Sequence, residues 1–93
     1  MRVDLNDSMY YVASCNTLYG QLLTRDGILY NERTMGTDLQ SNCFWYFSTI
    51  NEAEMYSSQH SELNPDREYS IYTAEGKFLA TYLCGKIDTR WKT

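Results

Sequence analysis

The feature that most constrains the fold is a continuous apolar segment at residues 43–47, which reads Cys-Phe-Trp-Tyr-Phe. Such a run is typical of a strand that is covered on both faces, so we predict a central strand of a sheet here. One face is expected to lie under a helix. The other face must be covered by the first hairpin, by the carboxyl-terminal tail or by a second protein chain.

A helix is predicted directly after this segment, from about residue 50 to about residue 61. Thr49 can cap the first free amides, and Glu52, three residues later, can complete a capping box. Residues 50, 53, 56 or 57, and 60 fall on one partly apolar stripe at helical spacing, which is expected to pack on the sheet. The helix is expected to end before Pro65, because proline disfavours helical geometry in the residue before it.

The part of the chain before this unit predicts a hairpin and a long connection. Residues 9–31 are expected to form two or three antiparallel strands around Asp26-Gly27, since both residues tolerate the positive φ angles of a tight turn. Residues 31–42 are polar and predict a loop of about a dozen residues.

A second hairpin is predicted after the helix. Residues 69–73 and 77–83 carry strand-forming side chains, and Gly76 between them suits a turn position. Successive side chains of a strand point to opposite faces. The last strand is therefore expected to show Phe78, Ala80 and Tyr82 on one face, with Leu79 and Leu83 on the other.

These elements predict a single small α+β domain over residues 1–93. Its sheet is mainly antiparallel, with four to six strands in the order β-β-(β)-β-α-β-β, and one helix covers one face. Residues 84–93 are expected to form a loosely ordered tail, or a tail in which Trp91 docks back on the sheet.

Charge is unevenly distributed along the chain. The formal net charge is −4, and residues 52–75 hold six acids against the single base Arg67. Clustered carboxylates repel a phosphate backbone and attract a basic partner surface, although a solvated helix face is the alternative explanation. Bases dominate after residue 77, and Trp91 lies among them, which is the one feature that favours a nucleic acid. We expect no direct binding of nucleic acid.

The candidate chemical groups are few. Cys15, Cys43 and Cys84 match no zinc or redox spacing, and residues 1–7 are too polar for a signal peptide, so we expect reduced cysteines and a cytoplasmic protein. Cys43 and Cys84 are expected to be buried. His60 is the single histidine, and no motif pairs it with a cysteine. We predict no metal site, no cofactor and no membrane span.

The leading hypothesis is a non-catalytic binding protein that occludes a basic surface on a larger protein or nucleoprotein. The first alternative is a homodimeric structural or small-ligand-binding domain, with an apolar strand face buried between subunits. The second is a small enzyme that uses Cys43 or Cys84 with His60. The predicted partner-binding residues are Glu52, Glu54, Met55, Gln59, Glu62, Asp66, Glu68, Tyr72 and Trp91.

In its size, its acidity and its lack of catalytic motifs, the chain resembles the accessory inhibitors that phages and other mobile elements encode. These include anti-CRISPR and anti-restriction proteins. The resemblance implies an inhibitor of a defence protein in the host cytoplasm, which presents carboxylates where phosphates would otherwise bind. The residues that would do so here are Glu52, Glu54, Glu62, Asp66 and Glu68.

Overall fold

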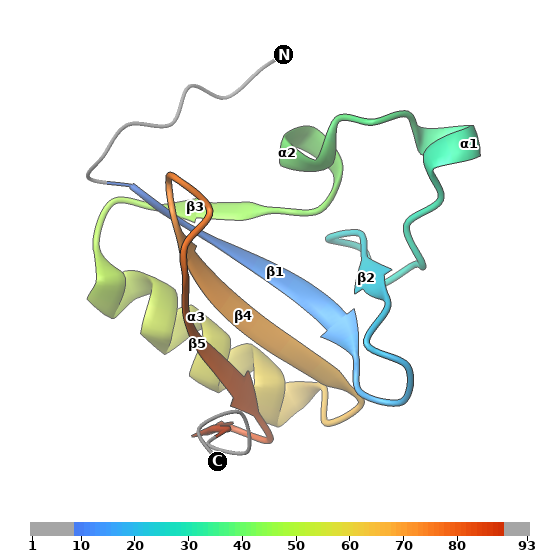
Figure 1. The fold of residues 1–93 in the computed structure, drawn as a ribbon. Coiled ribbons are helices and arrows are strands. Elements are labelled where there is room, and N and C mark those ends of the chain that lie inside the picture. The colour runs from blue at the N-terminus through green and yellow to red at the C-terminus, as the bar shows by residue number, and fades with distance from the viewer. Residues whose placement is uncertain (1–8, 89–93) are drawn as a thin grey trace.

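The computed structural model describes residues 9–88, apart from the side chain of Gln40. These residues form an α+β fold in which a six-stranded antiparallel sheet carries one main helix, as predicted (Figure 1). In chain order the elements are β1 (Tyr10–Asn16), β2 (Leu22–Leu23), α1 (Glu32–Met35), α2 (Leu39–Asn42), β3 (Trp45–Phe47), α3 (Ile50–Leu63), β4 (Arg67–Thr73), β5 (Phe78–Leu83) and β6 (Lys86–Ile87).

The central strands of the sheet are β1 and β4. They pair along their whole length, from Tyr10 opposite Thr73 to Asn16 opposite Arg67. The other edge of β1 is shared, because its first half pairs with β3 and its second half with β2. β5 pairs with β4, and the short β6 pairs with β5.

The segment at residues 43–47 is not a central strand, so that prediction is wrong. Its strand part is β3, which within the described residues pairs with β1 alone. Trp45 and Phe47 pack against the core on one face of the sheet. Tyr46 lies on the other face, where its ring is 6.4 Å from that of Tyr11. A short edge strand that touches both layers therefore carries the apolar pattern of a buried strand.

Helix α3 begins where the capping pattern predicts and ends at Leu63, two residues later than expected. The Thr49 hydroxyl accepts a hydrogen bond from the Glu52 amide at 3.2 Å and donates to the Glu52 carboxylate at 2.9 Å. The Ser48 hydroxyl donates to the same carboxylate at 3.0 Å. These bonds satisfy amides and hydroxyls that the start of a helix would otherwise leave unpaired.

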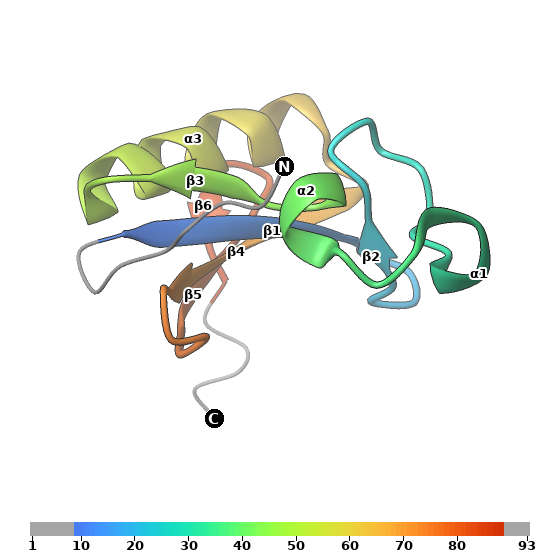
Figure 2. The ribbon, with the colours of Figure 1, turned by 90° about the horizontal axis from the view of Figure 1, so that it is seen from above.

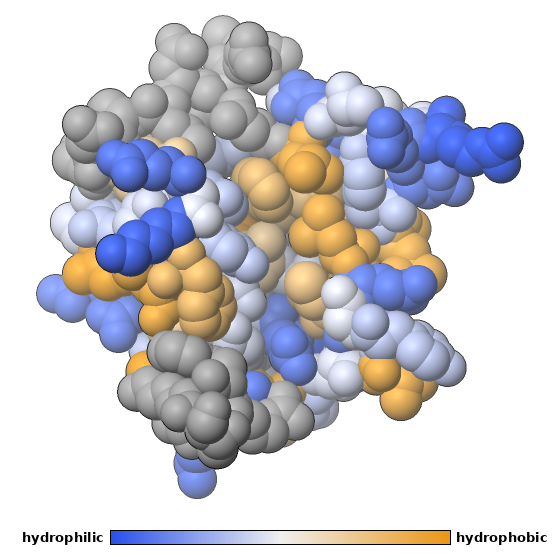
Figure 3. Space-filling view, in the orientation of Figure 1, coloured by the Kyte–Doolittle hydropathy of each residue, from blue (hydrophilic) through white to orange (hydrophobic). Residues whose placement is uncertain are grey.

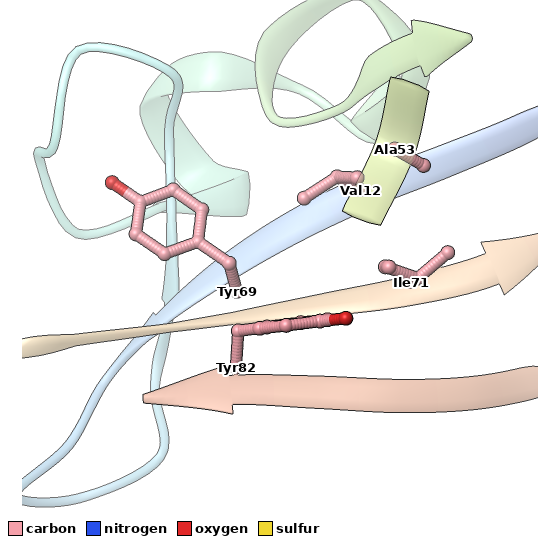
Figure 4. Close-up of a cluster of buried hydrophobic side chains, with 5 residues drawn as sticks. All are labelled: Val12, Ala53, Tyr69, Ile71 and Tyr82. Carbon is pink, nitrogen blue, oxygen red and sulfur yellow. The ribbon is translucent and has the colours of Figure 1, made fainter. Parts of the chain in front are cut away.

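The core lies between α3 and one face of the sheet. Val12 and Ile71 are fully buried at the centres of β1 and β4, and Ala53 of α3 packs on them (Figure 4). Tyr69 and Tyr82 complete this cluster. The buried residues of α3 are Ala53, Ser57 and Ser61, which recur every four residues. Their small side chains let the helix lie close to the sheet.

Helix α3 covers one side of the sheet only. Seen from above, α3 and the strands form two layers (Figure 2). Figure 1 looks onto the opposite side, where β1 and β4 lie in front of α3 and the short helices α1 and α2 lie beyond the edge that β2 and β3 form. We call this second side the open face. No helix within residues 9–88 covers it.

The polar segment at residues 31–42 is more ordered than the predicted loop, because two side chains nucleate short helices in it. Asn31 accepts a hydrogen bond from the amide of Arg33, which starts α1. Asp38 accepts one from the amide of Ser41, which starts α2. Each helix is a single turn, too short to produce an apolar periodicity in the sequence.

Three further details differ from prediction. The third strand of the first hairpin is reduced to one bridge between Leu23 and Leu29. Residues 84–88, expected in a loose tail, form a turn and β6, whereas residues 89–93 lie outside the described residues. Cys84 is exposed rather than buried, because β5 ends at Leu83. Cys84 occupies the turn that follows, with φ at 52°.

The face assignment of β5 also changes. The register places Ile71 opposite Ala80 but Tyr72 opposite Phe78, so one extra residue, Leu79, lies in β5 between these pairs. Such a bulge reverses the alternation of side chains beyond it. Phe78 therefore shares a face with Tyr72 and not with Tyr82.

Candidate functional site

Four of the predicted partner-binding residues form one stripe on the outer side of α3. The stripe consists of Glu52, Met55, Gln59 and Glu62, whose spacing of three and four residues places them on one side of the helix. All four side chains are exposed. Met55 exposes 62% of its surface and the adjacent Leu63 exposes 75%, so two apolar side chains lie in water among the carboxylates. We call these four residues the α3 stripe.

The other predicted carboxylates do not belong to the α3 stripe. Glu54 is half-buried and accepts a hydrogen bond from the Tyr82 hydroxyl at 3.1 Å, so it ties the helix to β5. Asp66 is exposed in the turn before β4, and its carbonyl accepts the amide of Thr17 at 3.0 Å. Glu68 lies on the open face opposite Cys15.

The predicted residues are therefore divided between two sides of the molecule. The α3 stripe points away from the sheet, whereas Glu68 and Tyr72 lie on the open face. Trp91 lies outside the described residues. One flat partner surface cannot contact both sides, because the sheet and the helix lie between them.

The main feature of the open face is a row of aromatic rings across four neighbouring segments, which no local pattern in the sequence indicates. The rings of Phe44 and Tyr11 stack with centroids 4.5 Å apart, and those of Tyr11 and Tyr72 with centroids 5.1 Å apart. Phe78 continues the row, 5.9 Å from Tyr72. Tyr46 lies beside Tyr11. We call these five residues the ring row.

A row of small side chains lies next to the ring row. Ala13, Ser70 and Thr81 are neighbours across β1, β4 and β5. They lie two residues from the rings along β1 and β4, and three residues from Phe78 along β5, where the bulge adds one residue. The hydroxyls of Ser70 and Thr81 are 2.9 Å apart and hydrogen-bonded to each other. All three residues are buried, although no helix within residues 9–88 lies over them. We call these three residues the small-residue row.

Figure 3 shows the open face in space-filling form. Hydrophobic residues gather over β5 and around β2, and a paler band that includes the two central strands runs between them. Tyr11 and Tyr72 lie on these two strands. The hydroxyl of tyrosine makes it less hydrophobic than phenylalanine, although its ring packs similarly. The open face is thus more aromatic than a hydropathy scale indicates.

Burial alters the acidity of groups on this side. It raises the pKa of Tyr46 to about 12, and it also raises the pKa values of Tyr11 and Tyr72. These hydroxyls stay neutral at physiological pH, so the ring row carries no charge of its own.

Two of the three cysteines are at least partly buried, and the His60 ring packs on an aromatic ring. Burial raises the pKa values of the Cys15 and Cys43 thiols, which lowers the fraction of reactive thiolate. His60 Nδ1 lies 2.9 Å from the Tyr56 carbonyl oxygen, and its ring stacks on the Tyr56 ring at 3.7 Å. Among residues 9–88, no three His, Cys, Asp or Glu side chains are grouped so as to hold a metal ion.

Comparison with known proteins adds no assignment. No protein-family model matches the chain, and neither a curated protein nor a solved structure matches it. In the described part of the chain, no helix has the length and apolar character that crossing a membrane requires.

Proposed function

We propose that the protein is a non-catalytic binding protein that occludes a basic surface of a larger macromolecule, and that it acts as an inhibitor of that partner. The observation that carries this proposal is the α3 stripe. Glu52 and Glu62 present negative charge there, while Met55 offers an exposed apolar side chain between them. Exposed carboxylates speed the approach of a basic partner, and desolvated apolar anchors hold it.

The partner surface that fits this stripe is basic with an apolar depression. The carboxylates of the stripe are exposed, so they attract a basic partner and make binding sensitive to salt. Met55 and Leu63 supply the area that becomes buried, and methionine adapts its shape to irregular surfaces. A host protein that binds nucleic acid through lysines and arginines, such as a defence nuclease, has this chemistry.

The geometry of the helix determines which carboxylate is suitable for a test. Glu52 caps α3 and Glu54 bonds to Tyr82, so replacing either changes the stability of the fold as well as the surface charge. Glu62 is exposed near the other end of the stripe and caps nothing. Glu62→Lys therefore changes the stripe with the smallest effect on folding. Glu32→Lys is the matched control, since Glu32 is exposed on α1, away from α3 (Figure 1).

The test is capture of a partner from a lysate of the native host by the tagged wild type and by both variants. We expect one dominant basic partner that the wild type and Glu32→Lys retain, that Glu62→Lys loses, and that about 0.5 M salt releases from all of them because charges are screened. Met55→Ala should retain the fast association but dissociate more quickly. Equal capture of a partner by Glu62→Lys and wild type would contradict the role of the stripe.

A further inference from the structure

The carboxyl-terminal half of the α3 stripe borders a hollow in the surface of the protein. Among the described residues, the hollow is lined by Gln59, Glu62 and Leu63, and its volume is about 350 Å³. This volume is at the lower end of the range for small-molecule sites. All three lining residues are exposed, and Leu63 exposes 75% of its surface. The hollow is therefore open to solvent and has room for one side chain of another molecule.

The turn between β5 and β6 supports the Glu62 side chain beside this hollow. Ser58 donates its hydroxyl to the Gly85 carbonyl at 2.8 Å, and the Gly85 amide donates to the Ser61 hydroxyl at 2.9 Å. These two bonds fix the turn to α3. A Cβ atom at Gly85 would lie 3.2 Å from Glu62 Cβ and 3.3 Å from Glu62 Oε2, so the Glu62 side chain packs on the bare backbone of the turn. This contact restricts the rotamers of Glu62, so less side-chain entropy is lost when a ligand pairs with its carboxylate.

The charge at this end of the helix favours an organic cation. Glu62 lies in the last turn of α3, and the carbonyl end of a helix carries partial negative charge. The described lining residues offer one carboxylate and one amide oxygen, which are too few ligands for a hard metal ion. An anion such as a phosphate is disfavoured by the same carboxylate.

An arginine side chain matches each of the three lining groups. Its planar guanidinium can pair with both oxygens of the Glu62 carboxylate. The Gln59 amide oxygen can accept a further N–H, and the methylene groups of the arginine can lie on Leu63. A lysine ammonium is compact and strongly hydrated, so it gains less from a fork of acceptors.

We propose that this hollow is the subsite for one arginine side chain of the basic partner. The inference rests on the function proposed above and names the residue that the partner presents to the α3 stripe. Met55 lies one helical turn before Gln59 on the same side of α3, where it would contact the apolar depression of the partner. The partner surface would thus place an arginine at the carboxyl end of α3 and an apolar depression next to it.

The test is an NMR titration of the isotope-labelled protein with a blocked tripeptide that carries arginine between two glycines. We expect saturable shifts of the backbone amides of Gln59, Leu63 and Gly85 with a Kd of about 10 mM, since one side chain supplies little affinity. A tripeptide with citrulline, which has the shape of arginine without its charge, should bind about fivefold more weakly. Glu62→Gln should weaken arginine binding about two- to fivefold, as the loss of an exposed ion pair implies. Glu32→Gln, the matched control on α1, should bind as the wild type does.

Two results of the titration would overturn the proposal. Equal affinity for the arginine tripeptide and for its citrulline or lysine counterpart would show that the hollow does not recognise a guanidinium. Unchanged binding by Glu62→Gln would show that the carboxylate is not the acceptor.

The titration contains no partner, so its outcome is independent of capture from a lysate. If the protein captures a basic partner but does not bind the arginine tripeptide, the subsite is wrong and the proposed function stands. If it binds the tripeptide through Glu62 but captures no partner, the subsite exists and the proposed function is wrong.

Discussion

The two faces of the sheet are built from the same strands but are completed in different ways. On the covered face, Val12 and Ile71 are fully buried under α3, and the rings around them enclose a dense core. On the open face, the adjacent residues Tyr11 and Tyr72 are partly buried, and their rings stack with centroids 5.1 Å apart. The comparison shows that alternation along β1 and β4 gives each face its own role. One face packs against α3 and holds the fold together, and the other gathers a row of aromatic rings.

The polar groups of the two faces differ in the same way. On the open face, the Ser70 and Thr81 hydroxyls bond to each other. On the covered face, the fully buried hydroxyls of Ser14 and Ser57 find no hydrogen-bond partner among the described residues. These unpaired hydroxyls destabilise the covered face. Their small side chains nevertheless let α3 lie close to the sheet, because larger apolar side chains would push the helix away.

The largest expected difference in stability is between substitutions of two adjacent residues of β4. Ile71→Ala should destabilise the fold by about 2–5 kcal/mol, because it leaves a cavity in the core under α3. Tyr72→Ala should cost about 1–2 kcal/mol, because it removes ring contacts at a face that water still reaches. Chemical denaturation at low protein concentration measures both losses. Equal losses would show that the open face belongs to the core as fully as the covered face does.

The next effect distinguishes two fully buried serines of α3. Gly85 donates its amide to the Ser61 hydroxyl at 2.9 Å, so Ser61→Ala should cost about 1 kcal/mol. Ser57→Ala removes an unpaired hydroxyl and favours the helix, so it should add about 0.5–1 kcal/mol of stability. Thermal unfolding of the two variants gives the comparison. A loss of stability in Ser57→Ala would mean that its hydroxyl is paired in solution.

The smallest effect is absent at neutral pH and appears only in alkali. Burial raises the pKa values of Tyr46 on the open face and Tyr56 on the covered face, each to about 12. A raised pKa means that the folded state favours the neutral phenol. The contribution of these two phenols to stability should therefore be fully present below pH 10, the ordinary pKa of tyrosine, and should be lost as the pH rises towards 12. Phenolate absorbance with Tyr46→Phe and Tyr56→Phe assigns the transitions, and ionisation of either residue near pH 10 would contradict its burial.

The parts of the fold that sequence predicts are those that depend on neighbouring residues. Thr49 and Glu52 indicate the start of α3, and Asp26-Gly27 and Gly76 indicate turns. Each of these signals depends only on residues that are close in the sequence. The α3 stripe is predictable for the same reason, since helical spacing alone brings its residues together. Glu54 is the exception, because its bond to Tyr82 joins residues that are distant in the chain.

The features that sequence does not predict depend on register between distant strands. Tyr11 and Tyr72 become neighbours only through the pairing of β1 with β4. Phe78 joins them only because a bulge moves it to their face. The chain holds nine tyrosines, but no local pattern indicates which of them share a face. The prediction of a central strand at residues 43–47 was wrong for a related reason. An edge strand that contacts aromatic side chains on both faces of the sheet has the same apolar pattern as a central strand.

The most direct test of the division of roles between the two sides is hydroxyl-radical footprinting of the protein with and without the partner that it captures. We predict that Met55 and Leu63 become protected in the complex, because the α3 stripe is the surface that meets a basic partner. Tyr72 and Phe78 should keep the reactivity that they have without the partner, because they lie on the other side of the sheet. Protection of Tyr72 with unchanged reactivity of Met55 would contradict this account, since it would place the contact on the open face.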